Sequence, residues 1–339
     1  AIVVLVWTGA VRVDNGYITQ GEVVALINYM SQILVELVKL ANLIININKS
    51  IACGNRIQSI FEMQPSITDG SGQKVDKVQT DTADRSEEAE YAVEFSHVGL
   101  TYAGAGDESL TDIDFKVKKG ETIGIIGGTG SGKSSVVNLI PRFYDVTSGF
   151  IKVDGKDVKD YPLEELRGKI GTVLQKAVLF HGTIRENLKW GNPDATEEDL
   201  NRAITVAQAK EFIDNKEGRL DFEIEQGGKN LSGGQRQRLT IARAVVKKPE
   251  ILILDDSASA LDFATDAALR KAIREMEGET TVFIVSQRAA SIQHADRIVV
   301  LDDGKIVGLG TSEELLESCE VYQEIYNSQF KKQEGGKTA

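Results

Sequence analysis

The sequence has few of the residues that build disulfide frameworks or metal centres. Only two cysteines occur among 339 residues, which excludes a disulfide scaffold and a four-cysteine zinc site: Cys53 and Cys319. Histidine is nearly as rare, and none of the three has ligand-like spacing with another: His97, His181 and His294. We interpret these histidines as ordinary surface or core residues.

An excess of basic side chains is also missing. The chain has 39 Lys and Arg residues against 51 Asp and Glu residues, a formal net charge of -12. A protein whose main task is to bind nucleic acid needs a basic excess, so we expect no nucleic-acid partner. Hydrophobic residues make up 41% and charged residues 27% of the chain, a balance typical of a globular protein.

The N-terminus has no basic leading segment. The chain starts at Ala1 inside an apolar run that ends at Trp7. Without basic residues before it, this run does not fit a secretory signal peptide, and it is too short to span a bilayer. We interpret the start as a cut through a longer polypeptide.

Residues 23–47 form the longest apolar stretch, which exceeds the roughly 20 residues that a membrane helix needs. At about 100° per residue, five of its polar side chains fall on one narrow stripe. These are Asn28, Gln32, Glu36, Lys39 and Asn46. The stretch alone fits two interpretations. One is a soluble amphipathic helix packed on a core; the other is a membrane helix whose polar stripe faces a cavity or a partner helix.

A polar segment, residues 64–90, follows this region. It is rich in Asp, Ser, Thr and Gly and poor in large apolar residues, as linkers are. Residues 1–63 hold four basic and four acidic side chains, so the whole acidic excess lies beyond them. We therefore expect a boundary here and a globular domain from residue 91.

From residue 91 onward, strand and helix patterns alternate. Residues 92–102 and 110–117 alternate apolar and polar side chains, and we expect them to add an antiparallel edge. Further strands are predicted at 121–126, 170–174, 251–255, 280–285 and 297–301, and helices at 132–141, 196–207, 233–247 and 263–276. Strands that alternate with helices predict an α/β fold with a buried parallel sheet.

Residues 127–134 read GGTGSGKS and fit the phosphate-loop pattern G-x-x-x-x-G-K-[ST], in the required place between a strand and a helix. Glycines let successive backbone N–H groups point at phosphate oxygens. Lys133 would reach the terminal phosphates, and Ser134 would ligate Mg²⁺. The candidate binding residues are Gly127, Gly128, Thr129, Gly130, Ser131, Gly132, Lys133, Ser134 and Ser135. The pattern does not fit G-x-G-x-x-G, which disfavours a dinucleotide fold.

The second part of such a site is an acid at the end of a buried strand. Four branched aliphatic residues, 251–254, precede Asp255. Ligands of open α/β sheets bind at the carboxyl ends of the strands, so Asp255 is expected to hold magnesium, directly or through water.

Residues 231–235 read LSGGQ and lie between the phosphate loop and the acid-ended strand. With these three motifs, residues 91–330 resemble the ATPase domain of an ABC transporter. The resemblance implies a P-loop NTPase with a helical subdomain, ATP and Mg²⁺ as ligands, and a head-to-tail pair of domains. The LSGGQ segment of one domain then faces the phosphate loop of the other. The residues assigned to that contact are Ser232, Gly233, Gly234 and Gln235.

Further positions match the family one by one. Tyr102 lies where an aromatic ring stacks on adenine, and Gln175 lies where a glutamine senses magnesium and couples to the membrane domain. Residues 259–262 match the loop that crosses to the partner domain, and residues 179–187 and 225–229 resemble segments typical of exporters.

The exporter-like segments favour the membrane interpretation of residues 23–47. Residues 1–63 would be the end of a transmembrane domain, residues 64–90 a linker, residues 91–330 the ATP-binding domain and residues 331–339 a tail. The resemblance implies a multi-pass protein of the cell membrane with a cytoplasmic ATPase domain, and a small-molecule or lipid cargo.

Two residues depart from the family pattern. Asp256 stands where the catalytic Glu is usual, and Gln287 stands where His is usual. Asp is one methylene shorter, so its oxygens would lie about 1 Å short of the attacking water, and such a misplacement can cost on the order of a hundredfold in rate. Glutamine can donate to a phosphate oxygen but cannot shuttle a proton.

We therefore predict one half of a heterodimeric exporter. Its own site would bind ATP but hydrolyse it poorly, and its LSGGQ segment would complete the site of a second half-transporter subunit. The alternatives are a homodimer that turns over slowly, a soluble ABC protein without transport activity, and a regulatory subunit that binds nucleotide and gates its partner.

Overall fold

The computed structural model describes residues 2–63, 65–70, 90–276 and 279–334, with side chains as far as residue 330. The chain divides into two compact units, residues 1–68 and 69–339. Most of the predicted linker, residues 64 and 71–89, lies outside the described residues, as do residues 335–339 of the predicted tail.

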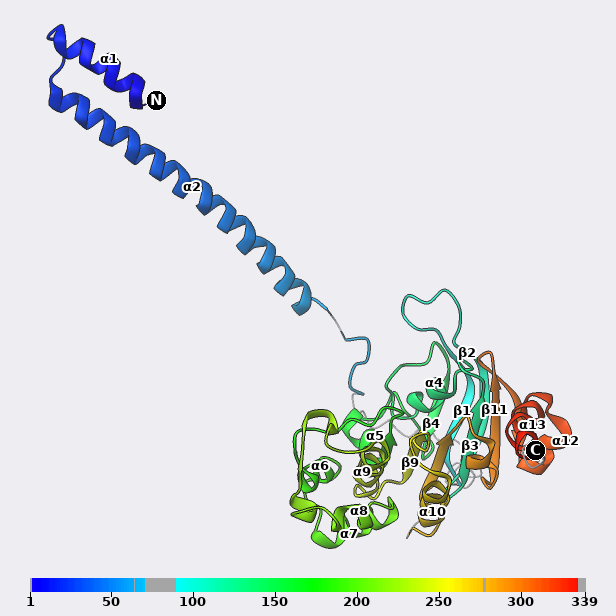
Figure 1. Cartoon of the computed structure of the whole chain (residues 1–339). Coiled ribbons are helices and arrows are strands. Elements are labelled where there is room, and N and C mark those ends of the chain that lie inside the picture. The colour runs from blue at the N-terminus through cyan, green and yellow to red at the C-terminus, as the bar shows by residue number, and fades with distance from the viewer. Residues whose placement is uncertain (1, 64, 71–89, 277–278, 335–339) are drawn as a thin grey trace. The chain divides into compact units, whose positions relative to one another are not determined.

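The first unit is a helical hairpin of α1 (Ile2–Asp14) and α2 (Gln20–Phe61). Thr19 caps α2 through a reciprocal pair of hydrogen bonds with Glu22, which satisfies backbone groups at the start of the helix. The two helices approach closely at Gly9, where an added Cβ would lie 2.8 Å from a methyl of Val23. A glycine at this position therefore allows the hairpin to close (Figure 1).

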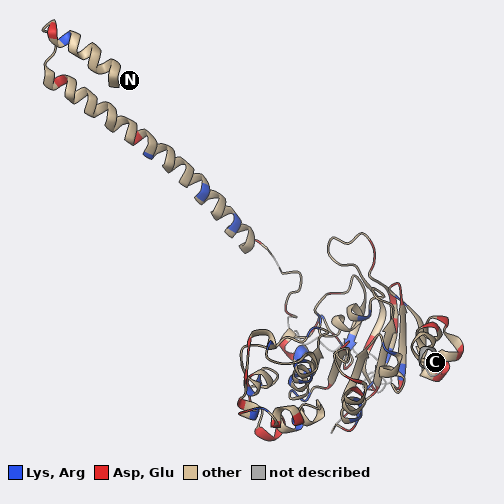
Figure 2. Ribbon diagram, viewed as in Figure 1, with Lys and Arg blue, Asp and Glu red and all other residues tan. Residues whose placement is uncertain are grey.

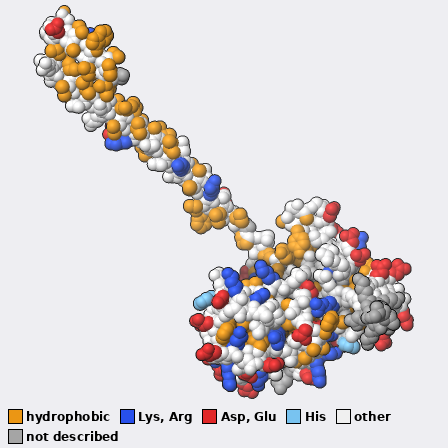
Figure 3. All heavy atoms as spheres, viewed as in Figure 1, with side chains coloured by type: hydrophobic (Ala, Val, Ile, Leu, Met, Phe, Trp, Pro, Cys, Tyr) orange, Lys and Arg blue, Asp and Glu red, His pale blue; other side chains and the backbone are white. Residues whose placement is uncertain are grey.

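Helix α2 presents apolar side chains over much of its length and has no buried residue. Figure 3 shows these hydrophobic side chains, and Figure 2 shows that charged residues along the helix are few. Glu36 and Lys39 form an ion pair one turn apart, with 2.7 Å between Nζ and Oε1. Among the described residues, α2 is the one helix long and apolar enough to cross a membrane.

The second unit is built on a six-stranded sheet in the order β12-β11-β3-β10-β9-β6. Its strands are β3 (Thr122–Gly127), β6 (Ile170–Val173), β9 (Ile251–Asp255), β10 (Thr281–Val285), β11 (Arg297–Asp302) and β12 (Lys305–Gly310). All pair in parallel except β12, which runs antiparallel to β11. The predicted α/β class is confirmed, and β12 is an edge strand that the sequence pattern did not indicate.

The two early alternating strands, β1 (Tyr91–Leu100) and β2 (Leu110–Lys118), do not extend the parallel sheet. They pair with β4 (Ser148–Val153) and β5 (Lys156–Asp157) in a separate antiparallel sheet of order β2-β1-β4-β5. The antiparallel part is therefore a second sheet, not an edge of the first. Alternation identified strands with one buried face, but it carried no information about their partners.

Helices cover the sheets, and those within residues 184–245 pack on one another as a helical group. The helices of this unit are α4 (Lys133–Leu139), α5 (Leu163–Lys169), α6 (Ile184–Lys189), α7 (Glu197–Val206), α8 (Lys210–Asp214), α9 (Gly233–Val245), α10 (Phe263–Arg274), α11 (Ala289–Ile292), α12 (Ser312–Ser318) and α13 (Glu320–Glu334). Two 3₁₀ turns, Arg219–Asp221 and Gln226–Gly228, and the paired strands β7 (Gly182–Thr183) and β8 (Glu223–Ile224) complete it. Helix α13 runs four residues into the segment predicted to be a tail.

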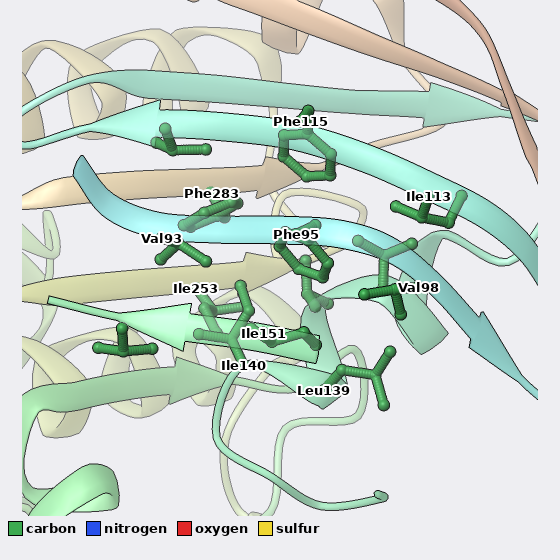
Figure 4. Close-up of a cluster of buried hydrophobic side chains, with 14 of the residues drawn as sticks. Val93, Phe95, Val98, Ile113, Phe115, Leu139, Ile140, Ile151, Ile253 and Phe283 are labelled. Carbon is green, nitrogen blue, oxygen red and sulfur yellow. The ribbon is translucent and has the colours of Figure 1, made fainter. Parts of the chain in front are cut away.

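Buried side chains of the two sheets meet in one core. Figure 4 shows Phe95 and Phe115 of the antiparallel sheet close to Phe283 and Ile253 of the parallel sheet, with Ile140 beside α4. Alternate residues of β9 face opposite layers, so Ile253 lies in this core while Leu252 and Leu254 lie in the core of the helical group. Burial on both faces explains why this strand reads as an unbroken apolar run.

Candidate functional site

The candidate site lies at the carboxyl ends of three neighbouring strands. Strand β10 lies between β3 and β9, and its Val285 is in register with Ile125 on one side and Asp255 on the other. Backbone hydrogen bonds continue beyond the strands, from Asp256 N to Val285 O at 3.0 Å and from Ser286 N to Ile125 O at 3.1 Å. The segments that follow these three strands therefore begin at one edge of the sheet, as expected for a ligand site in an open α/β fold.

The phosphate loop has a backbone that requires glycine. Gly130 and Gly132 have φ values of 85° and 93°, in the left-handed region that other residues rarely adopt. At Gly127, an added Cβ would lie 2.1 Å from the carbonyl oxygen of Leu301. The glycines thus serve both the curl of the loop and its close contact with β11.

Lys133 is buried at the start of α4. Its Nζ donates to the carbonyl oxygens of Gly127 at 3.0 Å and of Gly128 at 2.5 Å. Burial lowers the pKa of Lys133, and the nearby carboxylates of Asp256 and Asp255 oppose that shift. A desolvated ammonium surrounded by loop carbonyls is well placed to pair with a phosphate anion.

Ser134 and Asp255 meet across the site. Ser134 Oγ donates to Asp255 Oδ1 at 3.0 Å, and Asp255 is buried at the end of β9. Burial raises the pKa of Asp255, while the hydrogen bond from Ser134 lowers it. A hydroxyl and a carboxylate in contact are oxygen ligands of the kind that Mg²⁺ takes beside a phosphate, so this pair fits the predicted metal role.

Asp256 follows in a left-handed conformation with φ of 44°. Its N–H donates to Val285, and its carbonyl accepts from Ser259 N at 3.2 Å and from Ser259 Oγ at 2.9 Å. Its carboxylate accepts from Gln175 Nε2 at 3.1 Å. Hydrogen bonds thus hold both the backbone and the side chain of Asp256.

A cleft of about 670 Å³ brings together most of the predicted site residues. Those that line it are Tyr102, Thr129, Gly130, Gly132, Lys133, Ser134, Ser135, Gln175, Asp255, Asp256 and Gln287. Tyr102 stands at one side, where its hydroxyl donates to Ser135 Oγ at 2.9 Å and its ring packs edge-on against Tyr144. Gly127, Gly128 and Ser131 do not line the cleft, and two of them support Lys133 through their carbonyls.

The LSGGQ residues lie elsewhere in the chain. Ser232 caps α9, and its hydroxyl accepts from Gln235 N while Gln235 Oε1 accepts from Ser232 N. None of the described residues 231–235 lines the cleft. One copy of the chain therefore does not bring Ser232, Gly233, Gly234 and Gln235 to its own phosphate loop.

The two exporter-like segments contact each other. Gly227 N donates to Leu179 O at 3.1 Å, and β7 of the first segment pairs with β8 just before the second. Sequence reasoning assigned these segments separately, and only the fold reveals that they form one surface element of the helical group.

Sequence reasoning also missed part of the cleft wall. Residues 105–109 and Asp303 and Gly304 line it, although they belong to two separate turns. Gly304 approaches Ser109 so closely that an added Cβ would lie 2.7 Å from its carbonyl. No local motif marks these residues, because their contribution depends on the contact between β2 and β12.

The residues present fit a nucleoside triphosphate with Mg²⁺. The loop supplies backbone donors, Lys133 supplies a buried cation, and Ser134 with Asp255 supplies oxygen ligands at the edge of a cleft large enough for a nucleotide. Gln175 and Asp256 stand beside them. The site therefore has the parts needed to bind such a ligand and to place a carboxylate near it.

Comparisons with known proteins agree with this chemistry. Residues 110–259 match the family described as ABC transporter. The chain is 39% identical over 330 residues to an uncharacterized ABC transporter ATP-binding protein of Mycobacterium tuberculosis, covering 96% of this chain and 55% of that protein. It is 34% identical over 331 residues to the ATP-dependent lipid A-core flippase of Vibrio vulnificus, covering 97% and 55%.

A solved structure shows the same fold. The structure of a bacterial Atm1-family ABC exporter with ATP bound superposes with a TM-score of 0.75 at 29% identity, covering 92% of this chain and 53% of that one. The chain thus spans about half the length of the relatives it matches.

Proposed function

We propose that the chain carries the ATP-binding domain of an ABC exporter and belongs to a membrane pump that couples ATP binding and hydrolysis to export. The observation that carries the proposal is the meeting of Lys133, Ser134 and Asp255 at one cleft. Closure of two such domains over ATP would move the attached helices between inward and outward access.

The roles of the residues follow from their chemistry. The loop amides and Lys133 bind the phosphates, Ser134 and Asp255 hold Mg²⁺, and Tyr102 offers an aromatic face to the base. Bound Mg²⁺ would neutralise charge on the phosphate oxygens. Hydrolysis breaks the bond from the γ-phosphorus to the ADP oxygen as a water oxygen bonds to phosphorus, and the proton of that water needs an acceptor. We assign Asp256 as the acceptor of this proton. Gln175 donates to the Asp256 carboxylate and so orients it.

We propose further that this site hydrolyses ATP poorly. The two residues that depart from the family pattern, Asp256 and Gln287, line the same cleft. A backbone shift could restore the reach of the shorter Asp side chain, but three hydrogen bonds to Val285 and Ser259 oppose that shift. An acceptor held about 1 Å too far away would lower the rate on the order of a hundredfold.

The intact LSGGQ segment supports a second subunit as partner. Ser232 is exposed and Gly233 half-buried at the start of α9, and neither lines the cleft of its own chain, so they are available to face the site of another chain. A heterodimer in which the partner carries Glu and His at the two hydrolytic positions would use this segment productively. A homodimer would place two slow sites together.

The properties of α2 support a place in the membrane. At 1.5 Å per residue, its 42 residues span about 63 Å, roughly twice the 30 Å hydrocarbon core of a bilayer. Residues 23–47 would cross the membrane, and the more polar residues 48–61 would extend into water on the side of the ATP-binding domain. Because the domain needs the ATP that the cytoplasm supplies, we propose that this side is the cytoplasm.

ATP binding and turnover of the purified chain in detergent with lipid test this proposal. We expect MgATP binding by calorimetry and little hydrolysis, and we expect Asp256→Glu combined with Gln287→His to raise turnover at least tenfold. Asp107→Glu, which adds the same methylene at another acid of the cleft, serves as the control. Rapid hydrolysis by the unchanged chain that survives Asp256→Ala would contradict the slow-site proposal, and absent MgATP binding would contradict the function.

A further inference from the structure

The loop that carries Gln287 is held by a residue far away in the sequence. Gln329, on the C-terminal helix α13, donates from Nε2 to the carbonyl oxygen of Gln287 at 2.8 Å. Its Oε1 accepts from the N–H of Ala289 at 2.9 Å. The side-chain amide of Gln329 thus bonds to both ends of the tripeptide 287–289. Both bonds are to main-chain atoms of that segment.

The hydrogen bond to Ala289 meets a need of the local structure. Helix α11 begins at Ala289, and its N-cap residue, Arg288, makes no side-chain capping bond. The first N–H groups of a helix have no partner within the helix. Gln329 supplies one of these partners from outside, while Ser286 Oγ accepts from Arg288 N at 2.9 Å.

Helix α13 is anchored so that Gln329 reaches the loop. Tyr322, two turns before Gln329 and on the same face of α13, is fully buried in one apolar cluster with Ala289 and Ile292. The Tyr322 hydroxyl lies 2.8 Å from Ser312 Oγ. Because the anchor and the amide share one helix, the position of Gln329 is fixed by packing and not by a flexible tail.

The clamped loop contacts the other loops of the site. Arg288 Nη2 donates to the carbonyl oxygen of Ser259 at 3.3 Å, and Ser259 in turn bonds to the Asp256 carbonyl. The Gln287 side chain is exposed and lines the cleft. With its backbone fixed at residues 287 and 289, the loop holds the Gln287 side chain in the cleft. It is also linked to the backbone of Asp256, because Arg288 bonds to Ser259 and Ser259 bonds to Asp256.

We propose that Gln329 is a positioning residue of the nucleotide site: its amide fixes the backbone of residues 287–289 and so orients the side chain at position 287 towards the bound phosphates. The inference rests on the proposed nucleotide function. Because the two hydrogen bonds of Gln329 involve only main-chain atoms of the loop, they position Gln287 and a histidine introduced by Gln287→His in the same way.

Hydrogen exchange and kinetics of the full chain in detergent test this role. Gln329→Leu keeps the side-chain volume and removes both bonds, and Gln323→Leu is the matched control. Gln323 is a glutamine of the same helix whose Nε2 donates to Leu316 O at 2.8 Å, away from the site. We expect Gln329→Leu to speed amide exchange across residues 287–290 by roughly ten- to thirtyfold, as expected for the loss of two hydrogen bonds. Gln323→Leu should leave that exchange unchanged.

In the Asp256→Glu, Gln287→His background, Gln329→Leu should lower kcat about tenfold and leave KM for ATP within twofold. Gln329→Glu, which can still accept from Ala289, should fall between. Equal effects of the two leucine variants, or unchanged exchange at residues 287–290, would overturn the proposal. A chain that fails to bind MgATP would instead overturn the nucleotide function, and the exchange comparison would still decide whether Gln329 holds the loop.

Discussion

Ser134 Oγ donates to Asp255 Oδ1 at 3.0 Å, although the two residues are 121 positions apart. Ser134 lies in the first turn of α4, the helix after β3, and Asp255 ends β9, so the contact depends on β10 being the single strand between β3 and β9. It joins the two halves of the proposed magnesium site directly.

Asp255→Asn tests how much the buried carboxylate of Asp255 lowers the stability of the fold. Burial raises the pKa of Asp255 above 3.8, so the charged form is less favourable in the folded than in the unfolded chain. Stability from this group is therefore greatest at low pH and falls as the pH rises through the folded pKa. We expect Asp255→Asn to raise the melting temperature of the nucleotide-free chain at pH 7 and to abolish the stabilisation by magnesium with ATP. Thermal unfolding with and without both ligands measures each effect, and a lower melting temperature would contradict the first.

Lys133→Met should weaken MgATP binding without lowering the stability of the nucleotide-free chain. Burial lowers the pKa of Lys133, so the buried ammonium opposes folding at neutral pH, and this cost diminishes only as the pH rises through the lowered pKa towards 10.5. We expect at least a hundredfold loss of MgATP affinity, because a charge-assisted contact is removed, without loss of nucleotide-free stability. Lys271→Met, at a lysine whose side chain is 73% exposed, is the control in calorimetry. Unchanged affinity in Lys133→Met would refute the site.

Two glycines of the phosphate loop should respond differently to alanine. At Gly132, φ is 93° and an added Cβ would lie 2.6 Å from Leu110 Cδ2. Gly132→Ala should lower the free energy of unfolding by about 1–3 kcal/mol. At Gly128 no atom lies within 4 Å of the added Cβ, so Gly128→Ala should change that free energy by less than about 0.5 kcal/mol. Denaturant unfolding compares them, and equal losses would show that the clash at Gly132 is relieved.

His97 on the antiparallel sheet should titrate above its ordinary range. Its Nδ1 lies 2.7 Å from Asp112 Oδ1, and Asp114 lies nearby, so chiefly the bond to Asp112 raises the pKa of His97 above 6.5. The charged imidazole therefore stabilises the fold fully below pH 6.5, and this contribution is lost as the pH rises through the folded pKa. NMR titration should give a midpoint above 6.5 that falls in Asp112→Asn and stays in Asp107→Asn. A midpoint at 6.5 in the unchanged chain would contradict the contact.

The phosphate loop and the acid of β9 could be predicted from the sequence because their signals are local. Strand β9 was predicted at its observed bounds, since four aliphatic residues precede an acid. Helix α2 is much longer than the apolar stretch 23–47, because the mixed polar and apolar residues 48–61 continue the helix.

The parts that were missed depend on contacts between distant segments. Strand β4 contains Gly149 and lies in a sheet whose partners are far away in sequence, and β12 is an edge strand in which exposed residues alternate with less exposed ones. Gln329 looked like any polar residue of a terminal helix, because its two bonds reach 40 and 42 positions back along the chain. Such a role has no sequence signal without the fold.

The order of the strands also sets the dimensions of the site. Because β10 separates β3 from β9, the lysine loop and the acidic residues start two interstrand spacings apart, about 9–10 Å. That width is a property of main-chain hydrogen bonds and is nearly independent of side chains. Exchanges at residues such as Asp256 and Gln287 can therefore alter the speed of the chemistry without changing this spacing between the loop and the acidic residues.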